Sequence, residues 1–169
     1  MIESNTVFIL GAGASKPFGY PIGLELRKII CDNLGDPNLR GFKNNKLRFK
    51  LLEELGFDSS KILTFREEFR VSTMNSIDAF LEHRPEFIKI GKIAIADALI
   101  PYEKEEARLF DVENNWYAYI FNRIKTNFNS FINNKIAFIT FNYDRSLEYY
   151  LYRALSSAYG KEPADVLKV

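Results

Sequence analysis

The sequence has few of the residues that build disulfides and zinc sites. Its 169 residues contain one cysteine, Cys31, and one histidine, His83. A single cysteine cannot form a disulfide within the chain, and a structural zinc site needs about four Cys or His ligands. We therefore expect no metal cofactor and a reducing, cytoplasmic setting.

An excess of one charge and a long apolar run are also missing. Lys and Arg total 23 against 22 Asp and Glu, which gives a net charge of +1. Strong nucleic-acid binders carry a clear basic excess, so no specific nucleic-acid partner is evident, although a local basic face stays open. The start, MIESNTVFIL, lacks the basic region of a signal peptide. No apolar stretch approaches the roughly 20 residues of a membrane helix, so no membrane partner is expected.

The hydrophobic content is sufficient for a folded domain with its own core. Hydrophobic residues make up 47% of the chain and aromatic residues 15%. Two continuous apolar segments, residues 6–10 (TVFIL) and 135–141, are rich in β-forming residues. Each predicts a strand buried on both faces, as in a parallel sheet, followed by a loop and a helix.

Helical spacing of apolar residues predicts most of the remaining structure. Helices are expected within residues 21–35, 47–57, 59–73, 75–87, 87–100, 114–132 and 144–160, with a strand as the alternative for 87–100. The two strand–loop–helix units flank a helical insert over residues 42–132. The predicted fold is therefore α/β: a single domain over residues 1–169, with a Rossmann-like parallel sheet, a helical insert and a sheet incomplete at the C-terminus.

The first predicted strand leads into a glycine-rich loop, GAGAS, residues 11–15. A helix after such a loop directs free N–H groups and its dipole toward the end of the strand, which favours an anion. Gly11 and Gly13 would let a pyrophosphate approach the backbone, and Ser15 could donate a hydrogen bond. Lys16 replaces the third glycine of the G-x-G-x-x-G pattern, and the P-loop pattern also fails. A purely structural turn is therefore the alternative.

The second predicted strand ends in TFNYD, residues 140–144. Asn142 and Asp144 stand at its carboxyl end, where ligands bind in open α/β sheets. Asp144 is also explained as the N-cap of the next helix. Asn142 has no such explanation, because a polar amide directly after an apolar strand needs a partner.

Other conspicuous residues carry weaker functional signals. His83 lies near a predicted helix end without a partner motif, and Cys31 lies beside an apolar helix face. We interpret both as structural. The same interpretation applies to Asp78 and to the aromatic cluster of Trp116, Tyr117, Tyr119 and Phe121.

Taken together, these motifs resemble the sirtuin superfamily. Its members carry a GAGxS loop followed by a glycine–x–proline turn, and later a T-x-N-x-D motif. The corresponding segments here are GAGAS, Gly19-Tyr20-Pro21 and TFNYD. Between them, SIDAFLEHRPEF is similar to the SIR2-like branch found in bacterial anti-phage defence proteins. The resemblance spans roughly residues 5–155.

The resemblance implies an NAD+-binding domain whose ligand is cleaved to nicotinamide and ADP-ribose. Asn142 and Asp144 would lie around the nicotinamide and its ribose, and Asn142 would act in catalysis by orienting the ribose hydroxyls or the attacking water. The implied partners are NAD+ or a related nucleotide, together with a second copy of the chain or a defence-system protein. The implied cofactor-binding residues are Gly11, Ala12, Gly13, Ala14, Ser15, Pro21, Asn142 and Asp144.

The sequence departs from the family in two ways. Deacylase sirtuins usually carry a four-cysteine zinc module, so the single cysteine favours the NAD+-hydrolysing branch. The family's catalytic histidine follows the N-x-D motif, but no histidine follows Asp144, and His83 precedes it. We therefore expect the amino-terminal part of a longer SIR2-like protein, or a degenerate one. An NAD+ glycohydrolase and a nucleotide-sensing module without turnover both stay open, while the missing third glycine disfavours an NAD(P) oxidoreductase.

Overall fold

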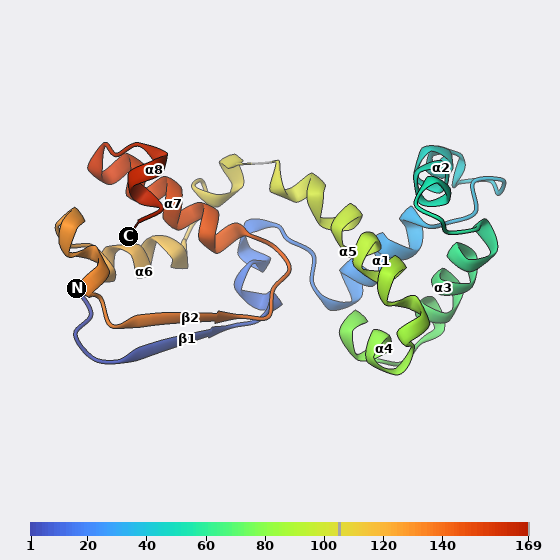
Figure 1. The fold of residues 1–169 in the computed structure, drawn as a ribbon, viewed down its shortest axis with the longest axis horizontal. Helices are drawn as coiled ribbons and strands as arrows, with labels where there is room; N and C mark the ends of the chain where they lie inside the picture. Colours follow the sequence, from blue (N-terminus) through green and yellow to red (C-terminus); the bar gives the residue numbers. More distant parts are fainter. Residues whose placement is uncertain (105, 169) are drawn as a thin grey trace. The chain divides into compact units, whose positions relative to one another are not determined.

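A computed structural model describes residues 1–104 and 106–168. In this part of the chain the structure is mixed α/β, with two strands and eight α-helices (Figure 1). The elements are β1 (Thr6–Leu10), α1 (Gly23–Asn33), α2 (Lys46–Glu54), α3 (Ser59–Val71), α4 (Ile77–His83), α5 (Ile88–Glu103), α6 (Trp116–Ile124), β2 (Ile136–Thr140), α7 (Ser146–Tyr159) and α8 (Pro163–Val166). The predicted α/β class is confirmed.

The chain divides into two compact units. The strand unit comprises Met1–Tyr20 and Tyr102–Val169, and the helical unit comprises Pro21–Pro101. The sequence interpretation placed a helical insert at residues 42–132. The packing gives other boundaries. Helix α1 belongs to the helical unit because it packs on α3, and helix α6 belongs to the strand unit because it packs on α7.

The sheet of the strand unit consists, among the described residues, of β1 and β2. The strands pair in parallel, from Thr6 opposite Ile136 to Leu10 opposite Thr140, so both predicted strands are confirmed. The predicted burial of both faces is wrong. Alternate side chains of a strand point to opposite faces, and α6 and α7 lie on one side of the sheet (Figure 1). On the other face, the large side chains Val7, Ile9 and Ile139 are 56%, 70% and 48% exposed.

Residues 114–132 do not form the single long helix that their spacing predicts. The α6 helix ends at Ile124, and a separate 3-10 turn, Phe128–Asn133, follows. The side chain of Asn134 explains the break, because its Nδ2 donates to the carbonyls of Ile124 and Phe131, both at 2.9 Å. These bonds satisfy carbonyl groups at the end of the helix and of the turn, where a continuous helix would use its own N–H groups.

In the helical unit, all five predicted helices are present as α1 to α5, and residues 87–100 are helical rather than a strand. Ser76 caps α4, since its Oγ accepts a hydrogen bond from the Ala79 N–H at 3.1 Å. The core of the unit is aromatic. Four rings pack with centroids 5.2 to 6.1 Å apart, those of Phe65, Phe69, Phe80 and Phe87.

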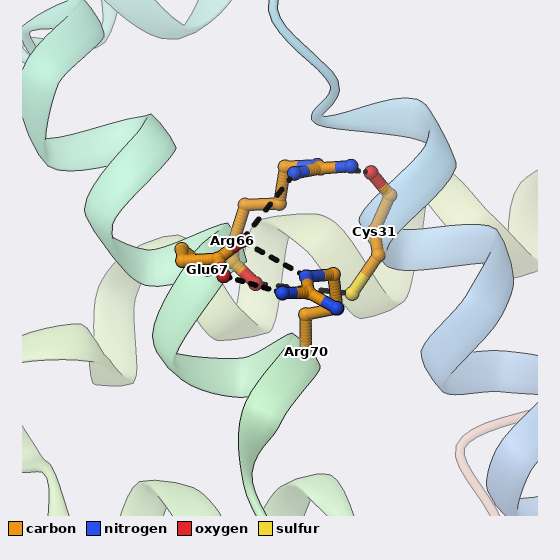
Figure 2. Close-up of polar contacts among 4 residues, drawn as sticks. All are labelled: Cys31, Arg66, Glu67 and Arg70. Atoms are coloured by element: carbon orange, nitrogen blue, oxygen red, sulfur yellow. Dashed lines mark hydrogen bonds and ion pairs between the residues drawn. The ribbon is translucent and has the colours of Figure 1, made fainter.

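Polar contacts also link α1 and α3. Arg66 Nε donates to the Cys31 carbonyl at 2.8 Å, and the Cys31 thiol lies 3.9 Å from the Arg66 carbonyl (Figure 2). Burial raises the pKa of the Cys31 thiol, so it stays neutral near pH 7. Cys31 is therefore a buried structural thiol, as its position beside an apolar face predicted.

Gly35 is required by close packing. A Cβ on this residue would lie 2.2 Å from a carbon of the Phe42 ring. We expect Gly35→Ala to lower the free energy of unfolding by about 1–3 kcal/mol, because the ring must move. Urea denaturation followed by circular dichroism measures this, with Gly35→Ala in a Phe42→Ala background as the control. An equal loss in both backgrounds would contradict the steric cause.

Candidate functional site

The glycine-rich loop continues from the carboxyl end of β1 as two short 3-10 turns, Ala12–Ala14 and Lys16–Phe18. The Ala14 N–H donates to the Gly11 carbonyl at 2.8 Å, which closes the first turn. The helix whose N-terminus was expected to face an anion, α1, begins only at Gly23, in the helical unit. The residues that directly follow β1 therefore belong to the two 3-10 turns rather than to the first turn of α1.

Neither Gly11 nor Gly13 is needed as glycine by the fold. Gly11 has an extended backbone with φ −115°, and neither residue is in the left-handed region. A Cβ added at either position would meet no atom of the described residues within 4 Å. Gly19 differs, because its φ is +86° and a Cβ there would lie 3.0 Å from Arg108 Nη1. The space beside Gly11 and Gly13 is open, which fits close approach of a ligand to the backbone.

Asn142 lies beside this loop because the two strands are in register. Leu10 pairs with Thr140, and the Phe141 N–H donates to the Leu10 carbonyl at 2.9 Å. Asn142 Nδ2 then lies 3.4 Å from the hydroxyl of the buried Ser15. Its Oδ1 is buried and accepts no hydrogen bond from the described residues. A buried acceptor without a donor costs about 1–3 kcal/mol, so this oxygen is suited to a donor on a bound molecule.

Asp144 is held at the start of α7. Its Oδ1 accepts hydrogen bonds from the Ser146 N–H at 3.1 Å and the Ser146 hydroxyl at 2.5 Å. The Tyr117 hydroxyl lies 2.6 Å from Ser146 Oγ and donates to it, since the Ser146 proton is directed at the carboxylate. Asp144 thus satisfies an N–H at the helix start, although the cap position itself falls on Arg145.

The first turn of α6 supports the loop and Asp144 together. Trp116 Nε1 donates to the Ala14 carbonyl at 2.8 Å, which ties the loop to the helix. Tyr117 is buried and stacks on Phe18 with ring centroids 4.2 Å apart, and burial raises the pKa of its hydroxyl so that it stays neutral. The core prediction is correct for Tyr117, but Tyr119 is 59% exposed. Sequence reasoning missed the polar role of Trp116, whose indole N–H was the available signal.

Tyr20 and Arg108 add further groups to the strand unit. Tyr20 is buried, and burial, followed by the charges of Glu103 and Asp144, raises the pKa of its hydroxyl. Arg108 carries its guanidinium 5.9 Å from the centre of the Tyr102 ring. It lines a pocket of about 380 Å³ together with Pro17, Phe18, Gly19, Asp111 and Val112. Sequence reasoning also missed this cation, because no motif marks it.

The structure brings most of the predicted site residues into one unit. Residues 11–15 lie in the strand unit with Asn142 and Asp144, and Asn142 contacts Ser15 directly. Pro21 is the first residue of the helical unit and is buried there. The predicted turn Gly19-Tyr20-Pro21 therefore spans the boundary between the two units.

His83 lies in the helical unit, exposed at the end of α4. Its Nδ1 is 2.8 Å from the Ala79 carbonyl, which fits the structural role expected of it. Over residues 1–104 and 106–168, no three His, Cys, Asp or Glu side chains are grouped so as to hold a metal ion. The helices in this same part of the chain all fall short of the length and apolar character that a bilayer crossing demands.

No family model, curated protein or solved structure matches the chain. A functional proposal therefore depends on the chemistry of the strand unit itself. The relevant groups there are the open backbone at Gly11 and Gly13, the Asn142 amide oxygen, and Arg108, which lines the pocket beside Gly19.

Trp116→Phe tests how the loop is held. The substitution keeps an aromatic ring but removes the bond to the Ala14 carbonyl, so we expect a loss of about 1 kcal/mol in unfolding free energy. We also expect faster amide hydrogen exchange in residues 11–15. Tyr119→Phe, at an exposed position of the same helix, should change neither measurement. Unchanged exchange in the Trp116 variant would show that the indole does not restrain the loop.

Proposed function

We propose that the strand unit belongs to a SIR2-like, Rossmann-type domain that binds NAD+, as part of an NAD+ glycohydrolase acting in anti-phage defence. The observation that carries the proposal is the buried Asn142 Oδ1, which accepts no hydrogen bond from the described residues and lies next to Ser15. A ribose hydroxyl or an ordered water is the kind of donor that would satisfy it. The likeness of GAGAS and TFNYD to the sirtuin motifs supports NAD+ as the source of that ribose.

The loop supports the phosphate part of the proposal. A pyrophosphate needs unobstructed backbone and positive charge. The space beside Gly11 and Gly13 is open, and Arg108 supplies a cation at the pocket that Gly19 lines. Ser15, whose hydroxyl bonds to the Ala12 carbonyl at 3.2 Å, would position the loop and Asn142.

Cleavage of NAD+ would break the bond between ribose C1′ and the nicotinamide nitrogen. Nicotinamide leaves as a neutral molecule with the electron pair of that bond, while a water oxygen bonds to C1′ and releases a proton. The transition state resembles an oxocarbenium ion, so orientation of the ribose and of the water determines the rate. Asn142 would orient the ribose or the attacking water. Asp144, fixed by Ser146, would place a negative charge near the developing cation.

The alternative is an NAD+-sensing module without turnover. It is favoured by the position of the imidazole: the single histidine precedes Asp144 in the chain and is bonded to a carbonyl of its own helix. In this case the strand unit would bind the nucleotide and signal to a partner protein or a second copy of the chain.

One experiment separates the two functions. The chain is incubated with NAD+, binding is measured by isothermal titration calorimetry, and nicotinamide and ADP-ribose are quantified by chromatography. Stoichiometric release of both products supports the glycohydrolase, and saturable binding without release supports the sensor. Absence of both binding and release would overturn the proposed NAD+ site.

A further inference from the structure

A concave surface of the helical unit gathers positive charge from two helices. Arg27 and Lys28 of α1 and Arg66 and Arg70 of α3 line a pocket of about 290 Å³. The other lining residues are Leu24, Cys31 and Asp32. We call this the α1–α3 basic pocket. Four cations converging on one small cavity repel one another, so an anion there would be stabilised.

Arg27 is held rigidly on one side of the pocket. Its Nη1 donates to the Ser72 carbonyl at 2.7 Å, and its Nη2 donates to the Met74 carbonyl. The guanidinium carbon also lies 5.2 Å from the centre of the Phe69 ring. Stacking and paired bonds fix the plane of the cation, so it loses little conformational entropy when a ligand binds.

Arg66 is fixed in the same manner on α3. Its Nε donates to the Cys31 carbonyl (Figure 2). Its guanidinium carbon lies 5.3 Å from the centre of the Phe42 ring. The neighbouring Cys31 thiol carries no charge near pH 7, because burial raises its pKa even though three arginines act in the opposite direction. The pocket wall at Cys31 therefore adds no negative charge that would repel an anion.

Lys28 and Arg70 provide the exposed part of the pocket. Arg70 uses Nε and Nη2 to bind Glu67, at 2.9 and 2.5 Å (Figure 2). Its Nη1 donates to none of the described residues. Lys28 is exposed, and in the described part of the chain its ammonium group has no hydrogen-bond acceptor. With Asp32 and Glu67 as the opposing carboxylates, the pocket keeps an excess of two positive charges.

We propose that the α1–α3 basic pocket binds a polyphosphate group, either the phosphate chain of a nucleotide or free inorganic polyphosphate. The two guanidinium groups held by backbone carbonyls, Arg27 and Arg66, match the oxygens of adjacent phosphates, and the exposed Lys28 and Arg70 can contact the rest of the phosphate chain. A single orthophosphate carries too little charge to use all four groups. This site is independent of the loop and amide residues proposed for NAD+ in the strand unit.

Binding is tested with the full chain at low salt by calorimetry and by thermal unfolding. Tripolyphosphate, ATP and orthophosphate are the probes, and we expect the first two to bind and to raise Tm while orthophosphate does not. Equal affinity for ATP and tripolyphosphate assigns recognition to the phosphate chain alone, and tighter binding of ATP assigns it to a nucleotide.

Variants of exposed residues attribute the binding to this pocket. The double variant Lys28→Gln, Arg70→Gln should weaken tripolyphosphate binding by at least about tenfold, because two charge-assisted contacts are lost. Glu67→Gln should tighten it, because an opposing carboxylate is removed. The pair Lys50→Gln, Lys89→Gln removes the same charge from exposed positions elsewhere in the unit and is the matched control. Circular dichroism verifies that each variant is folded.

Four results would overturn the proposal. The first is that neither tripolyphosphate nor ATP binds, and the second is an equal loss of tripolyphosphate affinity in the control pair. The third is binding of a single-stranded oligonucleotide that tripolyphosphate cannot displace. The fourth is loss of tripolyphosphate binding in Asn142→Ala. The third would assign the basic surface to nucleic acid, and the fourth would place the anion in the strand unit.

Discussion

Gly11→Val should leave the free energy of unfolding within about 0.5 kcal/mol of the wild-type value while weakening NAD+ binding by about a hundredfold. The extended backbone of Gly11, with φ −115° and ψ 179°, suits a β-branched residue. No atom of the described residues would lie within 4 Å of the new Cβ. The valine side chain would instead fill the space that a pyrophosphate must enter.

Urea denaturation measures the first quantity and calorimetry with NAD+ the second. Gly160→Val is the control with the opposite pattern, because Gly160 at the end of α7 has φ +58° and is not among the proposed NAD+-binding residues. This control should lose about 1–2 kcal/mol of stability through backbone strain alone. Unchanged NAD+ affinity in Gly11→Val would show that the loop is only a turn, and a large loss of stability would show that the fold itself needs this glycine.

The outcome for Gly11 also resolves an ambiguity that the sequence leaves open. A glycine can be required by a positive φ, by close packing or by the approach of a ligand. From the sequence alone, GAGAS fits any of these causes. The structure excludes the first two for Gly11 and Gly13 among the described residues, while Gly19 and Gly35 illustrate them. Only the third cause connects the loop to function.

The local patterns of the sequence predict the elements and their order well. Apolar spacing and caps lie within a few residues of one another, so β1, β2 and the helices of the helical unit follow from them. The proximity of Asn142 to Ser15 also follows, because the carboxyl ends of paired parallel strands lie together. The pairing of the two strands therefore predicts that the GAGAS loop and Asn142 lie close together, and this proximity is what makes them a candidate site.

Long-range hydrogen bonds account for what the sequence does not predict. The Trp116 bond to Ala14 joins residues 102 positions apart, and no local pattern signals it. The end of α6 depends on Asn134, ten residues beyond Ile124. The exposed sheet face depends on which helices cover the strands, and an apolar run such as TVFIL is equally compatible with one or two covered faces.

Asn142→Leu should weaken NAD+ binding without destabilising the protein. The side chains are similar in size, and the one hydrogen bond that the Asn142 side chain makes to a described residue is the long 3.4 Å contact with Ser15. Because the buried Oδ1 accepts no hydrogen bond from the described residues, we expect the free energy of unfolding to stay constant or to rise by up to about 1 kcal/mol. With NAD+ present, the lost acceptor should weaken binding by about tenfold to a hundredfold and reduce any nicotinamide release in proportion.

Ser156→Ala is the matched control for this variant. Ser156 Oγ on α7 is the other buried side-chain atom that, within the described residues, lacks a hydrogen-bond partner. Removal of this hydroxyl should stabilise the protein to a similar extent, because a buried polar atom without a hydrogen-bond partner is again eliminated. The NAD+ affinity should stay unchanged. If both variants gain stability and only Asn142→Leu loses NAD+, the unsatisfied amide oxygen is retained for the ligand. If Asn142→Leu instead unfolds the strand unit or binds NAD+ normally, Asn142 belongs to the framework of the fold and the proposed site is wrong.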